Sequence, residues 1–244
     1  MLDLSLKSLT QVPPIPDGTT TLHLGMNNLT TLPILPNSIK ILYLSFNKFK
    51  NIPILPVNLE ELYINNNQIT KIENLPTTLK KLYINYNNIT SIDKNDLPPN
   101  LEYLDCADNQ IMSISSLPPN LKHLDCAVNK LKELPKLPRN LKELYCSYNK
   151  IKNIPTFPES LINIGFLKNN IILPEYLSSE LKQFSYLDYG YINEKATEFT
   201  KLITIIRHKK RMLTIRQELI SKVFHPSRVE KWVEFYGTDW DDYI

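Results

Sequence analysis

The sequence predicts an α/β-type repeat solenoid, in which short parallel strands from successive units stack into one sheet. An asparagine recurs every 20 residues, with a single step of 22, and a similar apolar frame surrounds each one. Self-similarity at a fixed period of this length is typical of solenoids. The repeated asparagines are Asn27, Asn47, Asn67, Asn87, Asn109, Asn129, Asn149 and Asn169.

Each unit is predicted to begin with a short strand. The frame reads L-x-L-x-x-N-x-L-x-x-L-P, and in one unit Leu42 and Leu44 precede Asn47 while Phe49 follows it. Because side chains alternate along a strand, both leucines lie on one face and their neighbours lie on the other. Stacking such strands about 4.8 Å apart gives a parallel sheet. The leucines are therefore expected in the core, and the residues before, between and after them face outward.

The opposite side of each unit contains closely spaced prolines, as in residues 32–36 and 134–138. Proline lacks a backbone donor and favours extended or polyproline conformation. The sequence therefore predicts an irregular convex side without regular helices. The extra residues of the 22-residue step lie near 92–97 and are expected to bulge from this loop side.

Proline usage also predicts a domain boundary. Of the 18 prolines, all but Pro226 lie at or before Pro174. We expect about nine repeat units over residues 1–175, including an atypical first unit with Lys7 in place of the asparagine. Beyond them, Asn193 can cap a helix, and apolar residues follow at helical spacing. This pattern predicts a small α-helical cap over residues 176–244.

The repeated asparagines are predicted to form a structural ladder. A buried amide has two donors and one acceptor, so it can satisfy backbone groups of its own and the neighbouring unit. Cys106, Cys126 and Cys146 occupy an inward strand position in three consecutive units. Three collinear thiols do not make the tetrahedral geometry that zinc prefers. We expect them to be small core residues in a reducing compartment.

The outward strand positions are the candidate binding surface. In the middle outward column, His23 and three tyrosines precede Asp105 and Asp125, which predicts an aromatic stripe over the first half of the concave face and an acidic spot past its middle. Exposed tyrosines are enriched at interfaces, although β-propensity alone also places tyrosine on strands. The candidate partner-binding residues are Tyr43, Tyr63, Tyr83, Tyr145, Asp105, Asp125, His23, Tyr103 and His123.

Asp105 and Asp125 are expected to face each other on adjacent strands, near Asp108 and His123. Paired carboxylates suit acid–base catalysis, so an enzyme that uses them is one alternative. An open sheet, however, supplies no pocket with converging groups. This favours a contact for a basic partner or a weak cation site, and we expect no catalytic residue, no cofactor and no dedicated metal site.

A basic segment offers a second alternative, which is nucleic-acid binding. Residues 201–231 carry nine lysines and arginines and two acids. Such a cluster can bind phosphate backbones, although it is more often a solvated face of a helix. The possible basic patch consists of Arg207, Lys209, Lys210 and Arg211.

Composition points to an intracellular protein. The net charge of +3 is too small to argue for nucleic acid or an anionic membrane by itself. Asp3 stands where a signal peptide would need a basic region, and no apolar run approaches the roughly 20 residues that span a bilayer. We expect neither a signal peptide nor a transmembrane segment, no membrane partner and an undetermined oligomeric state.

Residues 117–129, Leu-Pro-Pro-Asn-Leu-Lys-His-Leu-Asp-Cys-Ala-Val-Asn, closely resemble the 20-residue leucine-rich repeats of bacterial type III secreted effectors, the YopM and IpaH group. The resemblance covers residues 1–175. It implies a leucine-rich-repeat horseshoe with strands on the concave side, working by binding host proteins. Some members of that group carry a ubiquitin-ligase domain with a cysteine nucleophile. No cysteine follows Cys146 here, so the resemblance does not extend to that activity.

The segment Phe224–Val229, together with residues 232–237, is similar to C-terminal segments in proteins of large amoeba-infecting DNA viruses. Both resemblances imply action inside a host cell, in the cytoplasm. The leading hypothesis is a non-enzymatic scaffold, viral or effector-like, whose concave face holds a protein or peptide partner. We expect this partner to carry basic residues and to be a host protein.

Overall fold

The computed structural model describes residues 1–153, 157–158, 160–166 and 168–170. By their contacts, the residues of the chain form two units, Met1–Ile192 and Asn193–Ile244, and every described residue lies in the first unit. Four predictions of the sequence concern residues outside this described part. They are the helical cap, the basic patch at Arg207–Arg211, the resemblance of the C-terminal segment to viral proteins, and the boundary at 175/176. They stay predictions.

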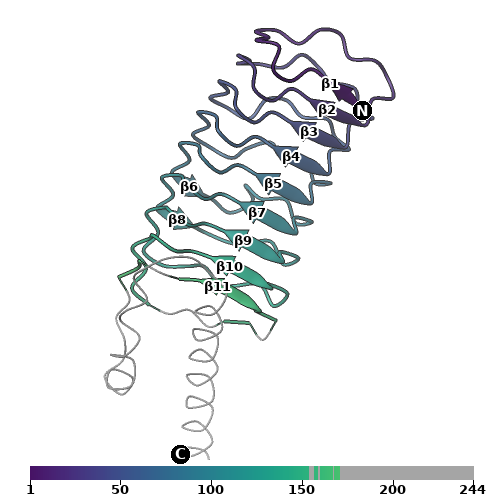
Figure 1. Cartoon of the computed structure of the whole chain (residues 1–244). Coiled ribbons are helices and arrows are strands. Elements are labelled where there is room, and N and C mark those ends of the chain that lie inside the picture. Colours follow the sequence, from purple (N-terminus) through teal and green to yellow (C-terminus); the bar gives the residue numbers. More distant parts are fainter. Residues whose placement is uncertain (154–156, 159, 167, 171–244) are drawn as a thin grey trace, which may run out of the picture. The chain divides into compact units, whose positions relative to one another are not determined.

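The described part is a solenoid of stacked coils with one long parallel sheet (Figure 1). Every neighbouring pair in the sheet is parallel, and successive strands pair in register, for example Tyr43 with Tyr63. The predicted parallel sheet is therefore confirmed. In order across the sheet, its nine strands are β1 (Leu2–Asp3), β2 (Thr21–His23), β3 (Ile41–Tyr43), β4 (Glu61–Tyr63), β5 (Lys81–Tyr83), β7 (Tyr103–Asp105), β9 (His123–Asp125), β10 (Glu143–Tyr145) and β11 (Asn163–Gly165).

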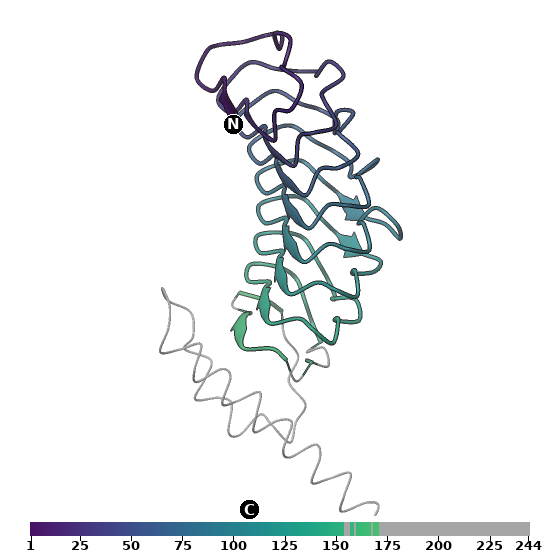
Figure 2. The same cartoon turned by 90° about the vertical axis from the view of Figure 1, so that its right-hand side faces the viewer.

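The other side of the described coils contains no helix and has two short strands. These strands, β6 (Ser91–Ile92) and β8 (Ser113–Ile114), pair in parallel as a second sheet that the sequence did not predict. The extra residues of the 22-residue unit follow β6 as an exposed turn, in which the Asp93 backbone N–H donates to a carboxylate oxygen of Asp96 at 2.6 Å. Figure 2 shows the nine-stranded sheet on the inner side of the shallow curve of these coils.

The core lies between the two sides and is filled by the inward strand residues and by the apolar residue two positions after each ladder asparagine. Leu42, Leu44 and Phe49 of one unit are all 0% exposed, as the repeat frame predicts. A recurrent turn precedes each strand of the nine-stranded sheet from β2 onward, in which the N–H two residues before the strand donates to a proline carbonyl, as from Ile39 to Pro36 at 3.2 Å. This turn places proline where no strand donor is needed.

The asparagine ladder is present as predicted. In Asn47, Oδ1 accepts from the Leu29 N–H at 2.9 Å, and Nδ2 donates to the carbonyls of Leu24 and Leu44 at 2.9 and 3.1 Å. Each amide thus bonds its own turn and the preceding unit. The ladder extends to the atypical first unit, because Asn27 Oδ1 accepts from the N–H groups of Lys7 and Leu9. Among the described residues, no buried side-chain nitrogen or oxygen lacks a partner.

The residue before each ladder asparagine has a left-handed backbone, with φ between +50° and +57° from Met26 to Tyr148. This conformation turns the chain out of the strand and lets the next side chain point inward. Asparagine and aspartate tolerate it, whereas other residues with a Cβ pay a steric penalty of roughly 1–2 kcal/mol. Only Asn66 and Asp108 among these residues are of the tolerant type.

The three cysteines are free thiols and are fully buried in the core. Burial raises the pKa of each thiol well above its ordinary value, so all three stay protonated at neutral pH. The Cys106 thiol donates to the Asp125 carbonyl at 3.3 Å. The structure agrees with their predicted role as small core residues.

Candidate protein-binding face

The outward side of the nine-stranded sheet, here called the strand face, consists of rows that cross the strands. The first row contains the first residue of each strand from β2 onward, and the second row contains the last residue of each strand. The third row lies two residues beyond the second, and the fourth row is the left-handed residue that follows. Backbone hydrogen bonds hold these rows in register, for example from the Met26 N–H to the Ser45 carbonyl at 2.9 Å.

An unbroken stack of aromatic rings crosses seven strands, from β2 to β10. Adjacent ring centroids lie 4.0 to 4.6 Å apart from His23 to His123, and the last step, to Tyr145, is 5.6 Å with a 48° tilt. This seven-ring set is called the aromatic stack. Its members in order are His23, Tyr43, Tyr63, Tyr83, Tyr103, His123 and Tyr145.

The sequence predicted an aromatic stripe over the first half of the face only, whereas the stack continues past the middle to Tyr145. It changes row between β5 and β7, because the Tyr83 ring in the second row packs on the Tyr103 ring in the first row at 4.6 Å and 33°. His123 continues the first row, and Tyr145 returns to the second. The sequence predicted all seven residues as candidates for partner binding, but it did not predict that rings of two different rows stack on each other. The repeat frame does not show in which direction along the strand a side chain is inclined.

Polar partners hold individual rings of the stack. The Tyr63 hydroxyl donates to a Glu61 carboxylate oxygen at 2.9 Å, and Lys81 pairs with Glu61 at 2.9 Å. Burial, followed by the bond to Glu61, raises the pKa of Tyr63, so its hydroxyl remains a donor. His123 Nδ1 lies 2.7 Å from a Glu143 carboxylate oxygen. These contacts fix the ring positions and reduce the rotamer freedom that binding would cost.

Asp105 and Asp125 are register partners on β7 and β9, as predicted, and they occupy the places that the stack leaves in the second row. Each carboxylate accepts a backbone N–H two residues on, from Ala107 at 3.1 Å and Ala127 at 2.9 Å. Burial, and then the neighbouring Asp125 charge, raise the pKa of Asp105 to about 6 against the lowering effect of the Ala107 bond. Burial also raises the pKa of Asp125.

The fourth row forms an exposed apolar ridge. Five large apolar side chains of this row are 43 to 57% exposed, and the row begins with Leu6 of the first unit at 73%. Two polar residues, Asn66 and Asp108, interrupt it. The name "apolar ridge" refers below to the exposed large apolar members between β2 and β10, which are Met26, Phe46, Tyr86, Val128 and Tyr148.

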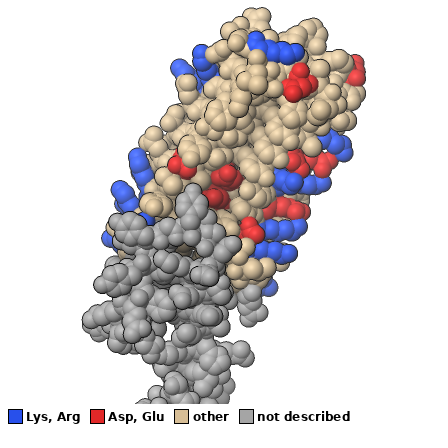
Figure 3. Space-filling view, in the orientation of Figure 1, with Lys and Arg blue, Asp and Glu red and all other residues tan. Residues whose placement is uncertain are grey.

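The opposite edge, at the residue before each strand, is charged. Glu60 pairs with Lys40 at 3.0 Å and with Lys80 at 2.7 Å, and Lys122 pairs with Glu102 at 2.6 Å. These residues are called the charged edge. Figure 3 shows paired blue and red side chains along one side of the described coils, while the red atoms in the middle of the view are surrounded by tan ones.

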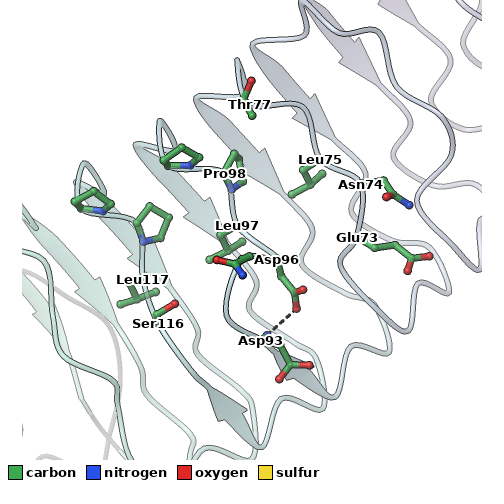
Figure 4. Close-up of a pocket in the computed structure, with 14 residues that line it drawn as sticks. Glu73, Asn74, Leu75, Thr77, Asp93, Asp96, Leu97, Pro98, Ser116 and Leu117 are labelled. Atoms are coloured by element: carbon green, nitrogen blue, oxygen red, sulfur yellow. Dashed lines mark hydrogen bonds between the residues drawn. The ribbon is translucent and has the colours of Figure 1, made fainter.

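A separate hollow of about 550 Å³ lies on the side away from the strand face, beside the 22-residue unit (Figure 4). Its lining combines prolines such as Pro98 with Glu73, Asp93 and Asp96. Among the described residues, however, no group of three or more His, Cys, Asp or Glu side chains could hold a metal ion. The described residues also include no helix long and apolar enough to cross a membrane.

The repeat frame, the parallel sheet and the ladder together define a leucine-rich-repeat solenoid. Residues 77–119, 99–139 and 119–159 match the family model described as Leucine Rich repeats (2 copies), and residues 58–77 match Leucine Rich Repeat. A comparison with the curated proteins found no match.

The chain is similar to several solved structures of bacterial proteins. YopM from Yersinia enterocolitica is similar, at 32% identity over 69% of this chain and 42% of that one, with a TM-score of 0.55. The leucine-rich effector YopM from Yersinia pestis is 30% identical over 62% and 49%, also with a TM-score of 0.55. The functional domain of InlJ from Listeria monocytogenes is 22% identical over 71% of this chain and 45% of that one, with a TM-score of 0.53, and this likeness shows the fold alone. The chain spans less than half the length of both YopM chains.

Proposed function

We propose that this protein is a non-enzymatic, effector-like scaffold that binds a host-cell protein on its strand face. The aromatic stack is the observation that carries the proposal. It presents seven stacked rings on strands paired in register, and the stacking, together with the hydrogen bond of Tyr63 to Glu61, lets the rings give a large contact area at small entropic cost. The likeness to YopM, described as an effector, supports the host-directed role.

The same geometry argues against a catalytic role for the aspartate pair. Both carboxylates accept backbone bonds on an outward sheet surface, and the hollow of about 550 Å³ is lined by residues of other segments. Catalysis of the acid–base type needs a positioned substrate and an enclosed site. The proposal therefore assigns Asp105 and Asp125 to partner contact.

An affinity capture from host-cell extract tests the proposal. The variant Tyr63→Thr, Tyr83→Thr, Asp125→Asn is compared with the unaltered full chain, because threonine keeps strand propensity while removing the ring. A matched control carries three substitutions away from the face: Ile34→Ser, Ile54→Ser and Asp93→Asn. Circular dichroism checks that all three proteins are equally folded.

Proteins captured by the unaltered chain and the control, but lost with the strand-face variant, are the expected result. Capture that survives in the strand-face variant contradicts the proposal. Captured material that disappears on nuclease treatment, and is unaffected by the strand-face substitutions, would instead support binding of nucleic acid through Arg207–Arg211.

A further inference from the structure

The apolar ridge is not explained by backbone preference. A left-handed φ favours glycine, asparagine or aspartate, and a β-branched residue such as Val128 at +52° is strongly disfavoured there. The chain uses tolerant residues at Asn66 and Asp108, so the turn itself accepts them. Five of the other left-handed positions nevertheless carry Met, Phe, Tyr or Val.

Core packing does not explain the ridge either. Its five side chains are 43 to 57% exposed, whereas the apolar residues that follow the ladder asparagines, such as Leu29 and Phe49, are 0% exposed. Asn66 and Asp108 interrupt the row, but its other five side chains are apolar and exposed, and such apolar surface on a monomer often marks an interaction site. The ridge therefore combines a conformational cost with solvent exposure, and contact with a partner would offset both.

Small residues separate the ridge from the aromatic stack. This third row contains the small residues Gly25, Ser45, Ala107, Ala127 and Ser147, with Asn65 and Asn85 between Ser45 and Ala107, and its carbonyls accept the N–H groups of the fourth row of the preceding unit. Ala107 is 8% exposed, and a Cβ at Gly25 would lie 3.2 Å from the Ser45 carbonyl oxygen. A ligand backbone can therefore approach the sheet along this row, with rings on one side and the ridge on the other.

The second, third and fourth rows, here called the strip, carry mostly negative charge. From the unit of β1 to the unit of β10, the second, third and fourth rows contain no lysine or arginine, and they contain Asp105, Asp108 and Asp125 near their middle. In the unit of β11, the fourth row carries Lys168. None of these three carboxylates is in an ion pair among the described residues, unlike Glu60 and Glu102 on the charged edge. A partner that covers them without a cation would bury unpaired charge, which is costly.

We propose that the strand face binds an extended basic and apolar polypeptide segment along the third row, with apolar side chains on the ridge and an arginine or lysine at Asp105 and Asp125. This inference rests on the proposed function and specifies its partner. Charge complementarity selects the cation, and the flanking rings of Tyr83 and Tyr145 favour it further through their π faces. From Phe46 to Tyr148 the strip spans five strand spacings, about 24 Å or roughly seven extended residues.

The test uses labelled nine-residue peptides and the full chain, read by fluorescence anisotropy. The probe has two central arginines flanked by leucines in a serine background. One comparison peptide has glutamates in place of the arginines, and another has serines in place of the leucines. We expect the probe to bind at least about tenfold more tightly than either, since one charge-assisted contact or one or two buried leucines is worth that much.

Variants then assign the two preferences to residues. Asp105→Asn with Asp125→Asn is expected to abolish the arginine-over-glutamate preference. Phe46→Asn with Val128→Asn is expected to abolish the leucine-over-serine preference, and asparagine suits the left-handed backbone at both positions. The control Asp93→Asn with Glu133→Gln changes the net charge equally on exposed residues elsewhere and is expected to leave all affinities unchanged.

Equal binding of the arginine and glutamate peptides, no binding of the probe, or preferences that survive in the variants would overturn the inference. These failures differ from failure of the proposed function. If the extract experiment shows a partner that depends on Tyr63 and Tyr83 while the peptides show no preference, the strand face binds a partner of another chemistry. If neither experiment shows binding, both proposals are wrong.

Discussion

The two edges of the strand face come from the same repeat but differ in how their side chains are satisfied. On the charged edge, lysines and glutamates from successive units pair with one another, as Lys40, Glu60 and Lys80 do. On the apolar ridge, exposed side chains stand on a left-handed backbone that disfavours them. A side chain at a repeat position can thus be paired within the protein or left available for a partner. An exposed side chain on a backbone conformation that disfavours it indicates the second case.

The acids show the same contrast. Glu60 is half-buried, with its side chain 31% exposed, and the hydrogen bonds and charges of Lys80 and Lys40 lower its pKa. Asp105 lies between Tyr83 and Asp125 in the second row, and burial raises its pKa to about 6. A carboxylate on the edge is thus stabilised by lysines of its own chain, whereas Asp105 on the face is in no ion pair among the described residues.

The largest expected effect is on the ladder that holds the ridge in place. Asn129→Ala removes the acceptor of the Ile111 N–H at 2.8 Å and the donors to the Cys106 and Cys126 carbonyls at 3.0 and 3.2 Å. Because these buried backbone groups would lose their partners, we expect the free energy of unfolding to fall by about 3 kcal/mol. Urea unfolding followed by circular dichroism measures it.

Lys132→Ala, an exposed neighbour, is the control for this experiment and is expected to change the free energy of unfolding by less than about 0.5 kcal/mol. An equal, small effect of both substitutions would show that the ladder does not support the turn. In that case the left-handed geometry of the ridge would need another cause.

The next effect depends on pH and distinguishes the acids of face and edge. The folded pKa of Asp105, about 6, is above its unfolded value near 3.8, so the folded protein binds more protons between these pH values. Its ionisation therefore lowers stability as pH rises from about 4 to 6. Asp105→Asn is expected to raise the free energy of unfolding by about 2 kcal/mol at pH 8 and to have little effect at pH 4.

Glu60→Gln supplies the opposite sign. The pKa of Glu60 is lower in the folded protein, so its contribution to stability is present above the unfolded pKa and is lost as pH falls. Urea unfolding at pH 4 and pH 8 measures both variants, and added salt should remove most of the Glu60 effect because exposed pairs are screened. The same pH dependence in both variants would contradict the assignment of face and edge.

The smallest expected effect concerns the ridge itself. Val128→Asn places a residue that tolerates φ of +52° where a β-branched residue now stands 43% exposed. We expect the free energy of unfolding to rise by about 1 kcal/mol, while Asn66→Asp, a change between tolerant residues, leaves it nearly constant. A loss of stability in Val128→Asn would show that Val128 packs within the protein and is not reserved for a partner.

Much of the fold was readable from the repeat. The period of the asparagines, the alternation of Leu42 and Leu44 and the placement of the prolines predicted the parallel sheet, the core and the ladder. The thiol positions followed as well. Each of these features depends on residues in one unit or in the same position of the next unit, so spacing alone specifies them.

The candidate site was predicted only in part. All seven residues of the aromatic stack were named from the sequence, but the passage from Tyr83 to Tyr103 was not, because it depends on how side chains lean across two neighbouring strands. The apolar ridge was missed entirely. The sequence does show apolar residues directly before the ladder asparagines, such as Met26 and Phe46. Their exposure and their left-handed φ, however, depend on the path of the folded chain and are seen only in the structure.

The sequence by itself thus determined the architecture: which residues repeat, which face inward, and which asparagines lock one unit to the next. Only the tertiary structure decided how the outward residues of different rows combine into a surface. The physical reason is that core position follows from periodicity along one chain segment, whereas ring stacking, carboxylate burial and the exposure of the ridge arise between units, from the register and close spacing of neighbouring strands.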